Sequence, residues 1–146
     1  MIPLSAKLPI FVYGTLRSGQ CNYLAYLAHT VHRKFPARAH NHSMFALDVP
    51  VVIDGPGTVT GELMIIRAAE YAPVIAALDR LEGCAPDGSG LYERVPRPVR
   101  YTRPRAGRER VCQAWIYQAT PVTMDRFRTA ARVASGDWVE WAGSVG

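Results

Sequence analysis

Two stretches of this sequence carry residues whose types and spacing could do chemistry: a glycine-hinged loop and a carboxylate at the end of a helix. The loop follows an apolar run over residues 8–13, whose β-branched and aromatic side chains predict a buried strand. Gly14 stops this run and lets the backbone turn sharply, with a positive φ available at little steric cost. Successive backbone N–H groups at such a turn can form a concavity that holds an anion. The stretch therefore predicts a strand that ends in an anion-binding loop.

The loop does not match the nucleotide-binding motifs. In the phosphate loop, Lys and then Ser or Thr follow the second glycine, whereas Gln20 and Cys21 follow Gly19 here. The dinucleotide fingerprint needs a third glycine, which this stretch lacks. A plain surface turn is the alternative to an anion site. Arg17 could assist in binding a carboxylate, or could be a solvated residue of that turn.

The second stretch is an amphipathic helix predicted over residues 69–81 and ended by a glycine at position 83. Apolar side chains recur in it at helical spacing, at Tyr71, Val74, Ile75, Leu78 and Leu81. Glu82 continues this apolar face at the negative end of the helix, so burial and the helix dipole should both raise its pKa. Asp79 could raise it further. Alternatively, the helix frays before Glu82 and the carboxylate turns to solvent.

The remaining pattern predicts a single α+β domain over residues 1–146, mostly antiparallel, whose strands can close into a small β-barrel with a few helices packed outside. Further strands are predicted over residues 32–48 (two strands), 50–53, 58–66, 92–101 and 111–118, and further helices over 22–29 and 124–133. Gly61 suggests a bulge or a close backbone approach. Asn22 is expected to cap its helix, and Trp138 and Trp141 to anchor the packing of the tail.

The composition is that of an ordinary soluble globular protein, with 49% apolar and 20% charged residues. No apolar run approaches the roughly 20 residues of a membrane helix, and no secretory signal is visible. Three separated cysteines favour a reducing compartment, so we expect a cytoplasmic protein. The net charge of +5 raises the question of nucleic acid. However, prolines interrupt the basic stretch 94–110, which predicts two strands joined by a basic hairpin loop, and we expect neither nucleic-acid nor membrane binding.

Two other kinds of site are disfavoured. Cys84 lies two residues from Glu82, but a thiol hydrolase needs a nearby histidine, and the four histidines are far away in the sequence. His40 and His42 alternate on a predicted strand, so both would project to one face. Two ligands without a clear third make a poor metal site, and we expect no metal.

Four motifs in order resemble the γ-glutamyl cyclotransferase-like superfamily. They are Tyr-Gly-Thr-Leu-Arg at 13–17, Leu-Asp-Arg-Leu-Glu-Gly at 78–83, Leu-Tyr-Glu-Arg at 91–94 and Ser-Gly-Asp-Trp at 135–138. The segment 13–22 is most similar to the γ-glutamylamine cyclotransferase branch. The resemblance spans residues 8–138 and implies a small, mostly antiparallel barrel with helices packed outside, in agreement with the pattern of strands.

The resemblance also implies roles for individual residues. It places the substrate's γ-glutamyl portion on the loop, with backbone N–H groups meeting the α-carboxylate, and it makes Glu82 the general acid and base. Tyr92 would line the pocket and donate a hydrogen bond, and Tyr117 would line it too. The implied substrate-binding residues are Tyr13, Gly14, Thr15, Leu16, Tyr92 and Tyr117.

The implied reaction is intramolecular and needs no cofactor. The α-amine of a small γ-glutamyl substrate attacks the γ-amide carbonyl, which gives 5-oxoproline and a free amine. The glycine-rich loop over residues 83–90 is longer than in some relatives, so the identity of the released amine stays open. The alternative is a non-catalytic module that uses the same pocket to bind a small ligand or a protein. The oligomeric state is unknown from the sequence.

Overall fold

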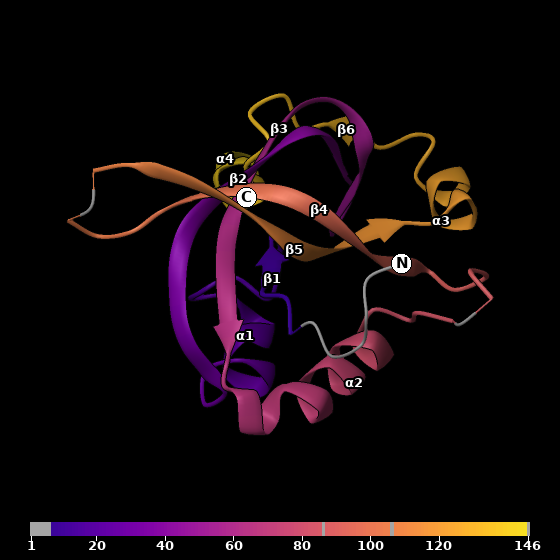
Figure 1. Ribbon diagram of the computed structural model, residues 1–146. Helices are drawn as coiled ribbons and strands as arrows, with labels where there is room; N and C mark the ends of the chain where they lie inside the picture. The colour runs from indigo at the N-terminus through magenta and orange to yellow at the C-terminus, as the bar shows by residue number, and fades with distance from the viewer. Residues whose placement is uncertain (1–6, 86, 106, 146) are drawn as a thin grey trace.

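The computed structural model describes residues 7–85, 87–105 and 107–145 (Figure 1). Its strands are β1 (Ile10–Val12), β2 (Val31–Ala46), β3 (Pro50–Ile66), β4 (Tyr92–Thr102), β5 (Glu109–Ala119) and β6 (Ala131–Arg132). Its helices are α1 (Cys21–Tyr26), α2 (Tyr71–Leu81), α3 (Pro121–Arg126) and α4 (Trp138–Val145), with a 3-10 turn, η1 (Ala68–Glu70), before α2. None of these helices is long and apolar enough to cross a membrane.

The strands form one curled sheet whose pairings close on themselves. The order is β3-β1-β5-β4-β2-β6, and β2 also pairs with β3, so five strands complete a ring. All of these pairings are antiparallel except that of β1 with β5. Figure 1 shows α1 and α2 together at the lower end of this curled sheet. The predicted α+β fold, a mostly antiparallel closed sheet with helices outside, is confirmed.

Two pairs of expected strands are single long strands in the structure. The region 32–48 forms the 16-residue β2, and the two segments expected at 50–53 and 58–66 join into the 17-residue β3. The register between them shifts where His40 lies opposite Thr58 and His42 lies opposite Asp54. The residues at 55–57 are therefore an irregularity inside a strand, although their Gly-Pro-Gly sequence is typical of a turn.

The helices near the two ends of the chain also differ from expectation. The helix expected over 124–133 is instead the short α3 followed by β6. It begins earlier than expected, because Thr120 caps it and Pro121 occupies its first position. The tail contains α4, in which Trp138 is buried and Trp141 packs against the core, as expected of anchors. Asn22 does not cap α1, whose first residue precedes it.

The core has two parts, one on each face of the curled sheet. Alternation along β1 sends Phe11 into the cluster enclosed by the strands, and Ile10 and Val12 into the cluster covered by α2. Tyr71, Val74 and Leu78 are the buried contacts that α2 makes with this outer cluster. The predicted apolar face of the helix is therefore the face that packs on the sheet.

Gly61 lets β1 and β3 lie against each other. A Cβ atom added at Gly61 would lie 2.2 Å from the backbone oxygen of Val12 and 2.8 Å from the Phe11 ring. Of the two explanations expected for this glycine, the close backbone approach is correct. Because β1 leads directly into residues 13–16, this contact also fixes where the glycine-hinged loop begins.

We predict that Gly61→Ala destabilises the fold by about 1–3 kcal/mol, since the backbone of β1 must move to admit the new atom. Gly143→Ala is the matched control, because no heavy atom lies within 4 Å of the added Cβ atom and the residue is exposed in α4. Alanine there should be neutral or stabilising, by up to about 1 kcal/mol. Urea unfolding of both variants measures the difference, and equal effects would contradict the proposed packing constraint.

Candidate active site

A cavity of about 200 Å³ opens beside the end of β1. All seven site residues expected from the sequence line it, namely Tyr13, Gly14, Thr15, Leu16, Glu82, Tyr92 and Tyr117. They come from the loop after β1, the end of α2, and the paired strands β4 and β5. The remaining lining residues are Phe11, Val12, Asn22, Val49, Pro50 and Leu81, none of which was expected in the site.

The loop over residues 13–22 is held by its own hydrogen bonds. The N–H of Arg17 donates to the Gly14 carbonyl at 3.0 Å, and the N–H of Asn22 donates to the Thr15 carbonyl at 2.9 Å. The Asn22 side-chain amide also donates to the Thr15 hydroxyl, at 2.8 Å. Within the described residues, the N–H groups of Thr15 and Leu16 donate no hydrogen bond, so two donors on this wall remain available to a ligand.

Gly14 is needed for space rather than for a left-handed backbone. Its φ lies outside the positive range, which corrects the conformation that we expected from the sequence. A Cβ atom at this position would lie 2.9 Å from the Pro50 ring, so the loop can rest against the start of β3 only without a side chain. Arg17 is not part of the cavity, because its guanidinium pairs with Asp137 at 2.9 Å and lies 3.8 Å from Glu62.

Glu82 is fixed at the C-terminus of α2. Its N–H donates to the Leu78 carbonyl at 2.9 Å, so the helix does not fray before it, and the frayed alternative is wrong. Gly83 follows with a φ of 66°. The N–H groups of Gly83 and Cys84 return to the carbonyls of Arg80 and Asp79, at 3.2 and 2.9 Å, which is a Schellman ending. Burial raises the pKa of Glu82 to about 7.

Asp79 does not contribute to that pKa as we expected. Its carboxylate accepts two hydrogen bonds from the Arg94 guanidinium, at 2.9 and 3.2 Å, and one from the Tyr117 hydroxyl, at 2.7 Å. The charge of Asp79 is therefore balanced by Arg94, and the raised pKa of Glu82 follows from burial.

Three tyrosines complete the walls of the cavity, and each donates its hydroxyl proton to the protein. Tyr13 donates to the Tyr117 carbonyl at 2.7 Å, Tyr117 donates to Asp79, and Tyr92 donates to the Pro50 carbonyl at 3.2 Å. Burial is the largest of the effects that raise the pKa of all three phenols. The hydrogen bond expected from Tyr92 to a ligand is thus made to Pro50 in the free protein.

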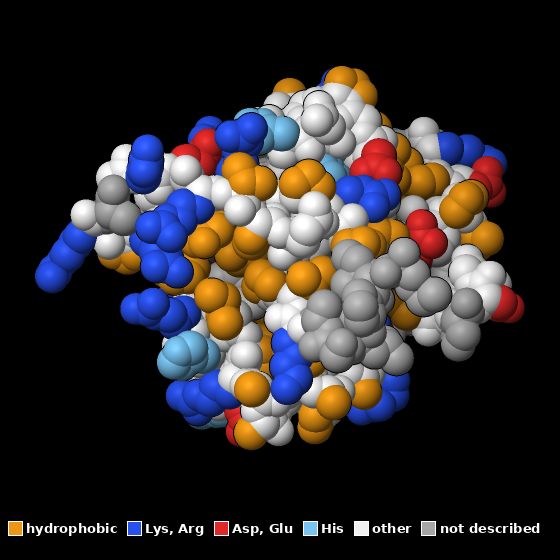
Figure 2. Space-filling model, viewed as in Figure 1, with side chains coloured by type: hydrophobic (Ala, Val, Ile, Leu, Met, Phe, Trp, Pro, Cys, Tyr) orange, Lys and Arg blue, Asp and Glu red, His pale blue; other side chains and the backbone are white. Residues whose placement is uncertain are grey.

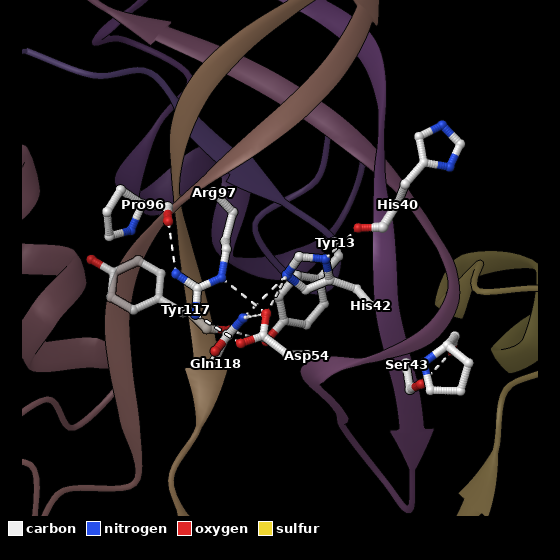
Figure 3. A network of polar contacts seen from close by, with 10 residues as sticks. Tyr13, His40, His42, Ser43, Asp54, Pro96, Arg97, Tyr117 and Gln118 are labelled. Carbon is white, nitrogen blue, oxygen red and sulfur yellow. Dashed lines mark hydrogen bonds and ion pairs between the residues drawn. The ribbon is translucent and has the colours of Figure 1, made fainter.

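Gln118, the residue after Tyr117, belongs to a polar network with His42, Asp54 and Arg97 (Figure 3). Gln118 is buried, and its side-chain amide lies 3.1 Å from the ring of His42 and 2.8 Å from the Asp54 carboxylate. Arg97 holds Asp54 through two hydrogen bonds of 2.9 and 2.7 Å. The network ties β2, β3, β4 and β5 together.

The two histidines of this region do not share a face, which corrects the expectation from their spacing. Asn41 lies between them with a φ of 60°, so the alternation of the strand is broken. His42 is buried, and His40 is exposed. Within the described ranges 7–85, 87–105 and 107–145, no three His, Cys, Asp or Glu residues lie close enough to hold a metal ion.

The thiol of Cys84 is a poor nucleophile. Burial raises its pKa to about 12, and the carboxylates of Asp79 and Glu82 raise it as well. A reactive cysteine needs the opposite shift, because the thiolate is the attacking species. Cys84 also lies outside the set of residues that line the cavity.

The basic stretch forms the expected hairpin of β4 and β5, and Lys and Arg side chains gather around its tip (Figure 2). Several of these charges are used within the fold. Arg97 pairs with Asp54, and Arg38 and Arg100 both pair with Glu109. None of the arginines of the basic stretch 94–110 is among the residues that line the cavity with Glu82.

Comparison with known proteins gives the family. A family model described as "Gamma-glutamyl cyclotransferase, AIG2-like" matches residues 10–140. The chain therefore belongs to the γ-glutamyl cyclotransferase, AIG2-like family. No curated protein sequence matches it at a significant level.

Solved structures agree on the fold. YkqA from Bacillus subtilis is 26% identical with a TM-score of 0.60, and the match covers 91% of this chain but only 40% of YkqA. An AIG2-like protein from Mus musculus is 24% identical with a TM-score of 0.59, over 89% of this chain and 88% of that one. A yeast γ-glutamyl cyclotransferase specific to glutathione is 13% identical with a TM-score of 0.54, over 77% and 69% of the two chains.

We predict that Glu82→Gln stabilises the fold at pH 8 more than at pH 5. The folded-state pKa of about 7 lies above the usual 4.5, so the folded state binds the proton more tightly than the unfolded state does. That contribution to stability is complete below about pH 4.5 and is lost as the pH rises through about 7. The full shift corresponds to about 3 kcal/mol, which bounds the gain in the free energy of unfolding.

Urea unfolding of wild type and variant at the two pH values measures this gain. The same measurements on Glu93→Gln, at an exposed position of β4, are the matched control for the loss of one surface carboxylate. A Glu82→Gln effect of equal size at both pH values would mean that this carboxyl group ionises as it does in water.

Proposed function

We propose that this protein is a γ-glutamyl cyclotransferase that releases 5-oxoproline and an amine from a small γ-glutamyl substrate. One observation carries the proposal: a carboxyl group with a pKa near 7 borders the same cavity as a loop with two free backbone donors. Membership of the γ-glutamyl cyclotransferase, AIG2-like family supports this reaction.

The loop would hold the substrate's α-carboxylate through the N–H groups of Thr15 and Leu16. Their donors are free within the described residues, and no Lys or Arg lines the cavity, so backbone dipoles would provide the anion site. Glu82 and the three tyrosines line the same cavity, so the α-ammonium group would lie among them. The substrate is then folded with its amine near its own γ-carbonyl carbon.

Glu82 would carry two protons, one after the other, from the attacking nitrogen to the departing nitrogen. As a carboxylate it takes a proton from the α-ammonium group, and the free amine attacks the γ-carbonyl carbon to form a new C–N bond. The protonated Glu82 then gives that proton to the departing nitrogen as the amide C–N bond breaks. Glu82, again a carboxylate, takes the second proton from the ring nitrogen and passes it to the released amine. The products are 5-oxoproline and the amine in its ammonium form, and Glu82 is again a carboxylate. No metal or cofactor takes part in these steps.

The raised pKa makes the first proton transfer less costly. An α-ammonium group beside its own carboxylate is at least as basic as a peptide N-terminus, so giving its proton to an ordinary glutamate costs about 5 kcal/mol or more. With the pKa of Glu82 near 7, that cost falls by about 3 kcal/mol. Holding the amine beside the carbonyl can lower the barrier by a further 7–11 kcal/mol or so, because attack is intramolecular.

The three cysteines of the described chain are free thiols, which supports a reducing, cytoplasmic location for this enzyme. A binding module with the same cavity is the competing function. It would bind γ-glutamyl compounds without converting them.

We predict that Glu82→Gln lowers 5-oxoproline formation at pH 8 by about 100-fold or more, because the amide can neither accept nor return the proton. Mass spectrometry of the products from a mixture of γ-glutamyl amides measures the loss. Glu93→Gln should retain wild-type turnover, since Glu93 is exposed on β4 and lies outside the cavity. Turnover by Glu82→Gln at the wild-type rate would remove Glu82 from the mechanism, and binding without product by the wild type would favour the binding module.

The dependence of kcat/KM on pH provides a second test. Because Glu82 must start as a carboxylate, kcat/KM should rise with pH and level off above about 7. With an ordinary glutamate, which is largely ionised by about pH 5, kcat/KM would level off at a lower pH. Residual activity of Glu82→Gln should lack this rise. A rise centred near pH 4.5 in the wild type would contradict the assignment.

A further inference from the structure

The three phenol hydroxyls of the cavity all act as hydrogen-bond donors to the protein. Each hydroxyl proton is donated to a protein acceptor: a backbone carbonyl for Tyr13 and Tyr92, and the Asp79 carboxylate for Tyr117. A hydroxyl group whose one O–H already donates a hydrogen bond can make a further hydrogen bond only as an acceptor. The phenols therefore offer acceptors to a ligand in this cavity, whereas the N–H groups of Thr15 and Leu16 offer donors.

Tyr117 differs from the other two because its acceptor is a charged side chain. The bond to Asp79 is 2.7 Å long, and a carboxylate is a stronger acceptor than a carbonyl group. Neither Asp79 nor its partner Arg94 lines the cavity. The direction of the Tyr117 O–H is therefore set by Asp79, a residue outside the lining of the cavity.

Arg94 fixes the position of the Asp79 carboxylate. Its guanidinium binds both carboxylate oxygens and lies 4.3 Å from the centre of the Trp115 ring. The Trp115 N–H donates to the Tyr71 hydroxyl at 3.0 Å, which ties the same group to the start of α2. With only 19% and 29% of the Arg94 and Asp79 side chains exposed, this pair is screened little by solvent.

We propose that Asp79 and Arg94 are positioning residues that hold the Tyr117 phenol as a hydrogen-bond acceptor for the α-ammonium group of the substrate. If Asp79 were absent, the phenol could turn its proton into the cavity and meet the ammonium group donor against donor. This inference rests on the proposed function for its choice of ligand. It concerns binding, however, and can be tested without turnover.

The probes are L-glutamate and glutarate, two acids that differ only in the α-ammonium group. Calorimetry should show that the wild type binds glutamate more tightly than glutarate. In the double variant Asp79→Leu/Arg94→Met, which replaces the ion pair by apolar groups of similar size, the affinity for glutamate should fall about tenfold or more. The affinity for glutarate should stay within about twofold. If the ion pair had a purely structural role, the double variant would bind glutamate and glutarate more weakly by the same factor.

Two further variants sharpen the comparison. Tyr117→Phe should lose the same preference for glutamate, and adding it to the double variant should cause no additional loss, because all three changes remove one interaction. Asp54→Leu/Arg97→Met removes the other bidentate pair, which holds β3 to β4 away from the cavity, and should keep the preference.

The inference is overturned if Asp79→Leu/Arg94→Met lowers the melting temperature but keeps the wild-type preference for glutamate. It is also overturned if the wild type binds neither acid, or binds both equally. A wild type that prefers glutamate in the expected way but makes no 5-oxoproline supports this inference and ends the proposed function, so the two failures are distinguishable.

Discussion

The hydrogen bonds around Gly83 are the constraint on which the site depends. They end α2 in a defined turn, and so they keep Glu82 on the face of the helix that packs towards the sheet. A loose helix end would let the carboxylate reach water, and its pKa would return to the ordinary range. The C-terminal turn of α2 thus determines whether Glu82 stays buried with a raised pKa.

The closed ring of strands provides the second wall. Strand β1 is only three residues long, yet it is inserted between β3 and β5, with Gly61 giving it room on one side. Because β1 is held on both edges, the loop that follows it starts from a rigid position. In the proposed function, a flexible amino-acid substrate would meet donors and acceptors that are already placed, which lowers the entropic cost of folding the substrate.

Local patterns in the sequence predicted the elements that carry the site, but not the contacts between them. Helical periodicity identified α2 and the position of Glu82 on its apolar face, and the residues expected from the motifs all line one cavity. The break in alternation at Asn41 could not be foreseen, because a positive φ in a strand has no sequence period. The pairing of Asp79 with Arg94 joins residues on different elements, so spacing along the chain gives no sign of it.

Pro50 links two sides of the cavity. Its ring occupies the space that a side chain at Gly14 would need, and its carbonyl accepts the proton of Tyr92. The distance between the loop and β4 is therefore set by a stiff pyrrolidine ring and a backbone oxygen. Changes in the exposed segment 47–49, which leads into this proline, could therefore reshape the entrance to the cavity without altering Glu82 or the tyrosines.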